Sequence, residues 1–207
     1  MSLQTMKRAL RQSIIAAREA IPASERVLKS GEIRRRIIGL ENYRQARTVL
    51  GYLNFGAEFE SGSWVRQALA EGKRVVLPRV NPATRQLYLY RVDDLETQLE
   101  PGSYGIREPI PARCEAAGLA EIDFILLPGV GFGRDGARLG YGGGFYDKLL
   151  ARMTHGPVLV AAAFALQVVE GIPQEPTDRK VDWLVTEHET IDCAAERVGA
   201  SGLFLER

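Results

Sequence analysis

The chain has 207 residues, of which 45% are hydrophobic, and this size and composition suit a single domain over residues 1–207. The 27 lysines and arginines nearly balance the 26 aspartates and glutamates, so a net charge of +1 gives no global field for nucleic acid or a membrane surface. Two cysteines suit a reducing compartment, and no stretch is long and apolar enough to span a bilayer, so we expect a cytoplasmic protein.

The chain begins with two helical patterns and a strand. Apolar residues three or four apart predict a helix over residues 2–20, and a proline separates it from a second helix over residues 23–40. Lys7 and Arg11 are four residues apart and therefore share one side of the first helix, and Arg18 lies two turns further along that side. They form either a solvent-exposed basic face or an anion site. The apolar run over residues 48–53 predicts the first strand.

An acidic loop follows this strand. Glu58 and Glu60 lie just beyond the strand's predicted carboxyl end and before a helix predicted over residues 64–70. Open α/β sheets keep their ligands at that edge. The two acids are therefore either ligand contacts or ordinary solvent-exposed loop residues.

The rest of the chain alternates strands with helical or irregular segments. Asp182 interrupts the last apolar strand, where a buried carboxylate needs a hydrogen bond, a metal or a cationic neighbour such as Arg179 or Lys180. The alternation predicts a three-layer α/β fold, with a mostly parallel sheet, helices on both faces and right-handed crossovers. Strands are predicted at residues 74–77, 87–92, 124–127, 158–164 and 181–186, a helix at 145–153, and irregular structure at 94–118.

A glycine-rich loop separates the strand at residues 124–127 from the helix at 145–153, with eight glycines between residues 128 and 144. Glycine loses the most backbone entropy on folding, so such a cluster indicates either a mobile connection or a close approach to a ligand. A strand, a glycine loop and a helix N-terminus together favour an anion site, and Arg138 adds a charge. Asp147, one step past the loop, is a natural magnesium ligand beside a phosphate.

Other phosphate motifs fit less well. The Gly-Lys-Ser/Thr sequence of a Walker A loop does not occur. Gly131, Gly133 and Gly136 match a dinucleotide fingerprint by letter, but no helix pattern opens directly after them and no acid follows about 20 residues on, at the end of the next strand. His155 and His188 are isolated, so no zinc or catalytic role is assigned to them.

Four segments together carry a family resemblance. These are Lys7-Arg8-Ala9-Leu10-Arg11, Leu53 with Glu58-Phe59-Glu60-Ser61, the stretch 127–147 with its Arg138-Leu139-Gly140-Tyr141-Gly142-Gly143-Gly144-Phe145-Tyr146-Asp147 signature, and Lys180-Val181-Asp182. In this order they resemble the 5-formyltetrahydrofolate cyclo-ligase family, also called 5,10-methenyltetrahydrofolate synthetase. The resemblance implies the NagB/RpiA/CoA transferase-like fold, which the sugar-phosphate isomerases and CoA transferases share.

The resemblance also implies a reaction. ATP phosphorylates the formyl oxygen of 5-formyltetrahydrofolate, the folate N10 attacks the activated carbon, and phosphate leaves as the ring closes. The products are 5,10-methenyltetrahydrofolate, ADP and phosphate, and Mg²⁺ is required. We expect a monomer whose partners are these two small molecules, with no nucleic acid and no membrane.

Residue roles follow from the same resemblance. Arg138 and Asp147 are implied to be catalytic, and Asp147 and Asp182 to hold magnesium. ATP binding is implied for Lys7, Arg8, Arg11, Arg138, Leu139, Gly140, Tyr141, Gly142, Gly143, Gly144, Phe145 and Tyr146. Folate binding is implied for Leu53, Glu58, Tyr104, Tyr141, Gly142, Gly143, Gly144 and Phe145.

One feature departs from the family pattern. Some relatives carry basic residues where this chain has Tyr141 or Gly143, which leaves open which cation stabilises the transferred phosphate, and Arg134 or Lys148 could assist Arg138. Two other functions are open to the same architecture. One is an isomerase or CoA-transferase relative that ignores ATP, and the other is a module that binds ATP without turning it over.

Overall fold

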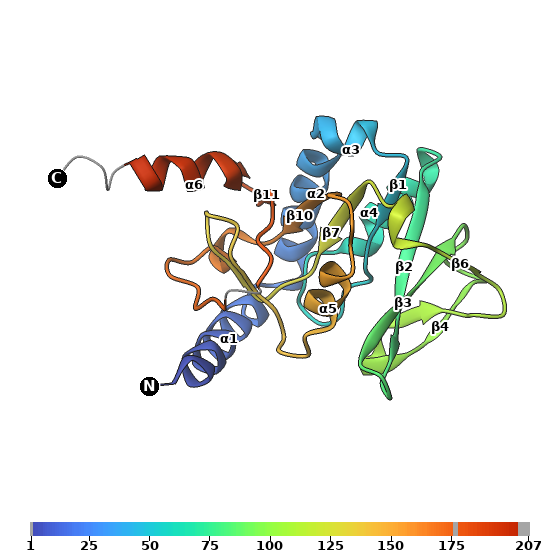
Figure 1. The fold of residues 1–207 in the computed structure, drawn as a ribbon, viewed down its shortest axis with the longest axis horizontal. Coiled ribbons are helices and arrows are strands. Elements are labelled where there is room, and N and C mark those ends of the chain that lie inside the picture. The colour runs from blue at the N-terminus through green and yellow to red at the C-terminus, as the bar shows by residue number, and fades with distance from the viewer. Residues whose placement is uncertain (1, 176–177, 203–207) are drawn as a thin grey trace.

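A sheet of eight strands runs through the part of the chain that the computed structural model describes, residues 2–175 and 178–202 (Figure 1). Five central strands are parallel, in the order β11, β10, β7, β1, β2. Antiparallel strands extend both edges, with β12 beside β11, and β3 and β6 beyond β2. The strands are β1 Thr48–Leu50, β2 Arg74–Asn81, β3 Gln86–Val92, β6 Glu115–Ala116, β7 Phe124–Leu127, β10 Val158–Ala162, β11 Trp183–Val185 and β12 Thr190–Asp192.

Helices cover both faces of this sheet. Because successive side chains of a strand point to opposite faces, Phe124 and Leu126 pack in one apolar cluster with Trp64, whereas Ile125 packs in another with Leu149. The helices are α1 Leu3–Glu19, α2 Ala23–Gly39, α3 Glu41–Gln45, α4 Ser61–Ala70, α5 Phe145–Ala151 and α6 Cys193–Gly202. The predicted three-layer α/β architecture is therefore confirmed.

Two short hairpins lie outside the main sheet. One pairs β4 Leu99–Pro101 with β5 Arg107–Pro109, and the other pairs β8 Gly131–Phe132 with β9 Arg138–Leu139. Single 3-10 turns occur at Ser103–Gly105, Leu119–Glu121 and Ala165–Gln167. The segment predicted to be irregular, residues 94–118, thus contains β4, β5 and β6. The first hairpin contacts β2, and the second carries the start of the glycine-rich loop.

Several predicted strand boundaries were wrong. The strands predicted at residues 158–164 and 181–186 are shorter, at Val158–Ala162 and Trp183–Val185. The first strand ends at Leu50 rather than at residue 53, which leaves the following residues free to form a loop. The second does not stop at Pro78 but continues to Asn81. Beyond Val76 this strand pairs only with β3, and a proline is tolerated in a strand that is open on one side.

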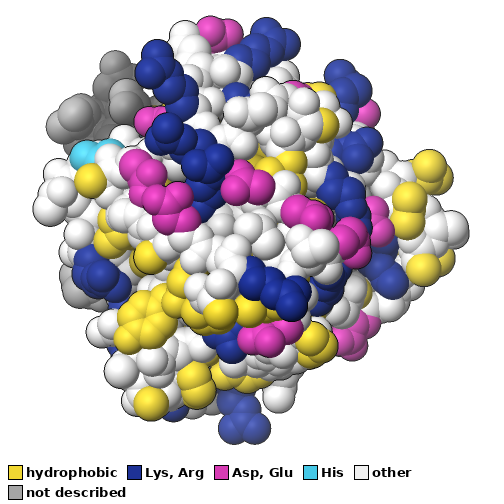
Figure 2. Space-filling view, turned by 90° about the vertical axis from the view of Figure 1, so that its right-hand side faces the viewer, with side chains coloured by type: hydrophobic (Ala, Val, Ile, Leu, Met, Phe, Trp, Pro, Cys, Tyr) yellow, Lys and Arg dark blue, Asp and Glu magenta, His cyan; other side chains and the backbone are white. Residues whose placement is uncertain are grey.

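The surface carries both signs of charge. Figure 2 shows lysine and arginine side chains interspersed with acidic ones over the face turned toward β2 and β3, in keeping with the balanced composition. None of the described helices is both long enough and apolar enough to cross a membrane.

Candidate active site

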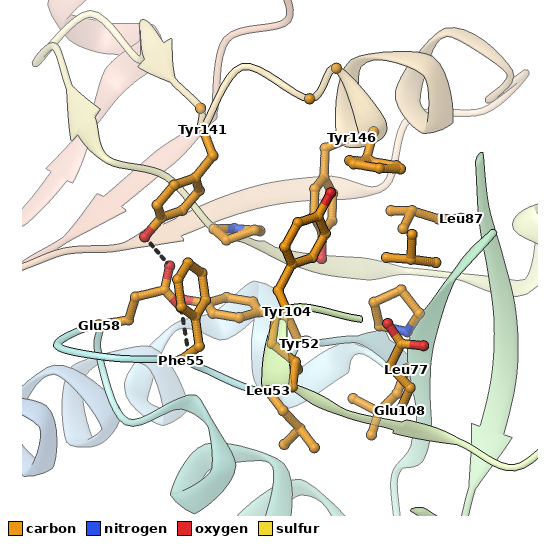
Figure 3. A pocket seen from close by; sticks show the side chains of 18 of the residues that line it. Tyr52, Leu53, Phe55, Glu58, Leu77, Leu87, Tyr104, Glu108, Tyr141 and Tyr146 are labelled. Carbon is orange, nitrogen blue, oxygen red and sulfur yellow. Dashed lines mark hydrogen bonds between the residues drawn. The ribbon is translucent and has the colours of Figure 1, made fainter. Parts of the chain in front are cut away.

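A cavity of about 340 Å³ opens beside the carboxyl ends of β1 and β7. Tyr52, Leu53 and Glu58 come from the loop after β1, and Pro128 follows β7. The opposite wall comes from β2, β3, the turn around Tyr104 and the strand β5, and the glycine-rich loop completes the lining (Figure 3). Because parallel strands present their carboxyl ends together, this edge gathers loops that are far apart in the sequence.

The glycine-rich loop contributes backbone to the cavity wall. Gly140 to Tyr146 line the cavity without interruption. Gly142 and Gly144 adopt positive φ angles of 95° and 68°, which a residue with a Cβ rarely does. The glycine backbone therefore forms part of a cavity wall, where the predicted close approach to a ligand can take place.

Arg138 and Asp147 face each other across this loop. Arg138 Nη2 lies 2.5 Å from Asp147 Oδ1, and Nη1 donates to the Pro128 carbonyl at 3.3 Å. The Arg138 side chain is 5% exposed and its Nε–H has no partner among the described residues, whereas Asp147 is 44% exposed. A guanidinium that lines the cavity beside an accessible carboxylate can bind an anion and still retain a counter-charge.

Glu58 occupies another wall of the cavity. It is 6% exposed, and it accepts hydrogen bonds from the Tyr141 hydroxyl and, at 3.1 Å, from the Phe55 N–H (Figure 3). Burial raises the pKa of Glu58 above its ordinary value, while the two hydrogen bonds and the positive charge of Arg18 act in the opposite direction. Burial, and next the nearby Glu58, also raise the pKa of Tyr141 above its ordinary range, so this hydroxyl stays protonated as the donor.

Apolar and aromatic groups fill the space between these polar groups. Leu53, Tyr104 and Phe145, all predicted to contact folate, line the cavity. The exposed fraction of Tyr104 is 75%, and its φ of 60° lies in the left-handed region. A non-glycine residue with that φ sits at a strained turn, which holds the ring at the mouth of the cavity.

The basic residues of α1 approach the site to different degrees. Arg11 Nε donates to the Gly140 carbonyl at 2.7 Å, which ties the helix to the glycine loop. Lys7 Nζ instead lies 3.2 Å from Asp178 Oδ2 and 3.4 Å from Glu175 Oε1, and Arg8 is exposed. None of these three is among the residues that line the cavity, and neither is the buried Leu139.

The predicted magnesium pair of Asp147 and Asp182 is not assembled. Asp182 precedes the amino end of β11, and its Oδ2 accepts a hydrogen bond from the Leu159 N–H at 2.9 Å. Its carboxylate thus satisfies the backbone at the start of β10, at the other edge of the sheet from the cavity. Nor do the described residues gather three or more histidine, cysteine or acidic side chains into a metal site.

The proposed helpers of Arg138 are likewise absent from the cavity. Arg134 forms ion pairs with Glu189 at 2.8 Å and Glu196 at 3.2 Å, and Lys148 is exposed on α5. Neither is among the lining residues.

Two charged residues near the site were not predicted. Glu108, which is 4% exposed, lines the wall beside Leu77 (Figure 3), and burial raises its pKa above the ordinary value. Arg18, which is 3% exposed, donates to the Tyr141 hydroxyl at 2.9 Å. Its position seven residues after Arg11, two turns further along the same helix, was the available signal. Glu108 had no comparable signal, because its segment showed no periodicity.

Comparisons with known proteins identify the family of this chain. The 5-formyltetrahydrofolate cyclo-ligase family model matches residues 3–187. A 5-formyltetrahydrofolate cyclo-ligase of Mus musculus is 29% identical over 90% of this chain and 96% of its own, and one of Mycolicibacterium smegmatis is 31% identical over 87% and 93%. The solution structure of Aquifex aeolicus 5,10-methenyltetrahydrofolate synthetase aligns with a TM-score of 0.80 at 31% identity, over 91% of this chain and 93% of that chain.

These matches span nearly the whole chain and include the cavity walls, the acidic loop and the glycine-rich loop. The chain therefore belongs to the 5-formyltetrahydrofolate cyclo-ligase family.

Proposed function

We propose that this enzyme uses ATP to cyclise 5-formyltetrahydrofolate to 5,10-methenyltetrahydrofolate, through a phosphorylated formyl intermediate. The observation that carries the proposal is the joint lining of one cavity by two kinds of site. Arg138 and the glycine loop suit a phosphate, and the aromatic wall with Glu58 suits a flat ring that bears N–H donors.

The chemistry explains why ATP is needed. The formyl oxygen is a poor leaving group, so its attack on the γ-phosphorus of ATP, with ADP departing, converts it into a phosphate ester. N10 then adds to the formyl carbon and loses its proton, and the carbon–oxygen bond breaks as phosphate leaves. No covalent bond to the enzyme forms, so the protein contributes positioning and charge stabilisation.

Arg138 is placed to stabilise the transferring phosphoryl group. It is buried, it lines the cavity, and it faces Asp147. A preorganised cation in a site shielded from water stabilises developing negative charge without reorganising. The glycine loop between Gly140 and Gly144 would hold the nucleotide's phosphates, and Lys7, Arg8 and Arg11 on α1 would approach the nucleotide from the far side of that loop.

Asp147 would hold Mg²⁺ together with phosphate oxygens. Its accessible carboxylate fits this ion, because magnesium is commonly bound by one or two carboxylates plus substrate phosphates. The ion would neutralise charge on the phosphates when bound. Asp182 takes no part in this assignment, since its carboxylate is bonded to the backbone of β10.

Glu58 would accept hydrogen bonds from the pterin N–H groups, and Leu53, Tyr104 and Phe145 would pack against the rings of the folate. A flat, partly aromatic ligand suits such a wall, because most of the surface it buries is apolar.

The direct test is the appearance of the long-wavelength absorbance of the methenyl product from 5-formyltetrahydrofolate. We expect it only when ATP and Mg²⁺ are both present. Asp147→Ala should abolish it, and Glu58→Ala should mainly raise the Kd for folate. Binding of ATP without formation of the methenyl product would favour the alternative of a non-catalytic nucleotide-binding module. Turnover of a sugar phosphate or a CoA ester without ATP would favour an isomerase or a CoA-transferase relative. Normal folate affinity in Glu58→Ala would reject the assigned pose.

A further inference from the structure

Three residues from three separate parts of the chain form a hydrogen-bonded series. Arg18 Nη2 on α1 donates to Tyr141 Oη at 2.9 Å, and the Tyr141 hydroxyl donates to Glu58 Oε1. The partners are 123 and 83 residues apart in sequence. The series therefore exists only in the folded chain, where it connects the first helix, the glycine loop and the acidic loop.

Arg18 is an unusual cation. It is 3% exposed, and its Nε–H has no hydrogen-bond partner within the described part of the chain. No described carboxylate forms an ion pair with it, and its guanidinium carbon lies 5.9 Å from the centroid of the Tyr141 ring. Burying a guanidinium without a direct counter-ion costs stability, so we expect this arginine to have a functional role that compensates for the cost.

Glu58 is the acid that this cation reaches. Arg26, which donates to the Ile21 carbonyl, and Glu60 border a second, smaller cavity together with Glu58. The groups that bond to the Glu58 carboxylate or interact with its charge are the Tyr141 hydroxyl, the Phe55 N–H, the neighbouring phenols Tyr52 and Tyr146, and Arg18. Arg18 supplies the positive charge in this set. Without that charge and the hydrogen bond that carries it, burial favours the neutral acid, which is a weaker acceptor than a carboxylate.

The series leaves room for a ligand. A carboxylate has two oxygens and about four lone-pair sites. The Tyr141 hydroxyl uses one on Oε1, and the Phe55 N–H uses one on Oε2. One site on each oxygen is therefore not used by these two bonds, and because Glu58 lines the cavity, two adjacent N–H groups of a pterin edge could pair with them. Tyr141 thus orients the carboxylate instead of competing with the ligand.

We propose that Arg18 is a positioning residue for folate recognition, which acts through Tyr141 to hold Glu58 as an oriented carboxylate at the cavity wall. This inference rests on the proposed function, because it concerns the acid assigned to the pterin. It also gives Tyr141 a role that its side chain alone would not have, since a tyrosine without the arginine brings no positive charge to the acid.

The first experiment uses the enzyme without ligands, so that its outcome does not depend on the proposed function. The protein is labelled with 13C at the glutamate carboxyls, and the Glu58 signal is assigned by its loss in Glu58→Gln. We expect Arg18→Met and Tyr141→Phe each to move the titration of Glu58 to higher pH, by about one unit if the charge acts through the hydrogen bond. Arg18→Lys should restore part of the wild-type titration. Arg35→Met, which removes an exposed arginine paired with Glu32, is the matched control and should leave it unchanged.

The second experiment measures the Kd of 5-formyltetrahydrofolate without ATP across a pH series. In wild type, folate affinity should fall at low pH as Glu58 becomes protonated. In Arg18→Met and Tyr141→Phe this fall should begin at a higher pH, so that affinity is up to about tenfold lower between the two titrations and recovers at still higher pH. A uniform loss of affinity at every pH, with an unmoved Glu58 titration, would show a purely structural role and overturn the proposal. Should Arg18→Met fail to fold, Tyr141→Phe decides, because it breaks the series and keeps the arginine. Wild-type enzyme that binds no folate would refute the proposed function but not the titration result.

Discussion

At the scale of single residues, the buried charge of Arg138 is expected to affect the chemical step and not the binding of folate. Arg138→Met keeps the length of the side chain and removes the charge. We expect kcat to fall by about 10²- to 10³-fold, the loss typical of removing one preorganised donor to a transition state, with little change in the KM for folate. Steady-state kinetics with each substrate varied in turn measures the split. The control is Arg134→Met, whose guanidinium is paired with Glu189 outside the cavity and should not affect kcat. A fall confined to the KM for folate would contradict the assignment.

Glu108 is a second buried carboxyl in the same cavity, and it affects stability. Burial raises its pKa, while N–H groups of Val80 and Ser103 lower it to a smaller extent. A carboxyl whose pKa is raised in the folded state binds more protons there than in the unfolded chain. Its presence therefore costs stability as the pH rises above its ordinary value near 4.5 and through its raised folded pKa.

Glu108→Gln removes that cost and keeps the shape of the side chain. We expect the variant to gain free energy of unfolding relative to wild type near pH 8 and to lose this advantage near pH 4, as measured by urea denaturation at each pH. Glu100→Gln, on the neighbouring strand β4, is the comparison, because Glu100 is 42% exposed and paired with Arg79. A constant difference between Glu108→Gln and wild type at all pH values would exclude the titration of Glu108 as its cause.

At the scale of elements, the turn between β8 and β9 requires a glycine. Gly136 has a φ of 87°, and a Cβ added there would lie 2.3 Å from the Val181 carbonyl oxygen, which belongs to the backbone. Gly171 has a similar φ of 69° and no atom within 4 Å of such a Cβ. Both positions therefore require a positive φ, but only at Gly136 would a side chain also collide with neighbouring atoms.

Gly136→Ala should destabilise the protein clearly more than Gly171→Ala. The strained φ costs each variant about 1–2 kcal/mol, and the steric overlap adds to this only at Gly136. Chemical denaturation of both variants measures the difference. Because the hairpin holds Arg138, we also expect Gly136→Ala to lower kcat. Equal losses of stability in the two variants would show that the backbone relaxes around the added methyl group.

Several elements of the fold could be predicted from local patterns. The run at residues 124–127 is continuously apolar because β7 lies between β1 and β10 and is buried on both faces. Pro78 was misleading, since the consequences of a proline depend on which side of the strand has a partner. The hairpin of β4 and β5 showed no periodicity, because strands of three residues are too short to reveal one.

At the scale of the whole molecule, the sequence indicated which loops follow the ends of strands, but not which of their side chains contact one another. Glu58 and the glycine-rich loop each follow a predicted strand, and they meet at the cavity because these two strands are parallel neighbours. The magnesium role of Asp182 was implied only by the family resemblance, and its bond to the Leu159 N–H, 23 residues away, has no signal in local spacing. Arg18 reaches the site only through Tyr141, a partner that local spacing cannot indicate.

An ion pair joins α2 to the segment that follows β11. Lys29 on α2 donates to Glu187, just after β11, at 2.8 Å, and Glu187 also accepts from the Ala165 N–H at 2.8 Å. Burial alone would raise the pKa of Glu187, but the hydrogen bonds and the charge of Lys29 outweigh it and lower the pKa below the ordinary value. The pair therefore stabilises the protein above about pH 4.5, and this stabilisation is lost as the pH falls through the lowered pKa of Glu187.

Glu187→Gln should lower the free energy of unfolding by about 1–3 kcal/mol near pH 7, since the side chain is 5% exposed and bonds a charged partner. The loss should shrink as the pH falls through the lowered pKa of Glu187. Glu25→Gln is a matched control, because Glu25 pairs with the same Lys29 at 3.3 Å but is 50% exposed. It should cost no more than about 0.5 kcal/mol, as exposed pairs on one helix do. Urea denaturation of both variants across an acidic pH series separates the contacts. An equal loss in both, or a loss from Glu187→Gln that does not shrink as the pH falls, would mean that the Lys29–Glu187 ion pair does not hold α2 to the end of the sheet.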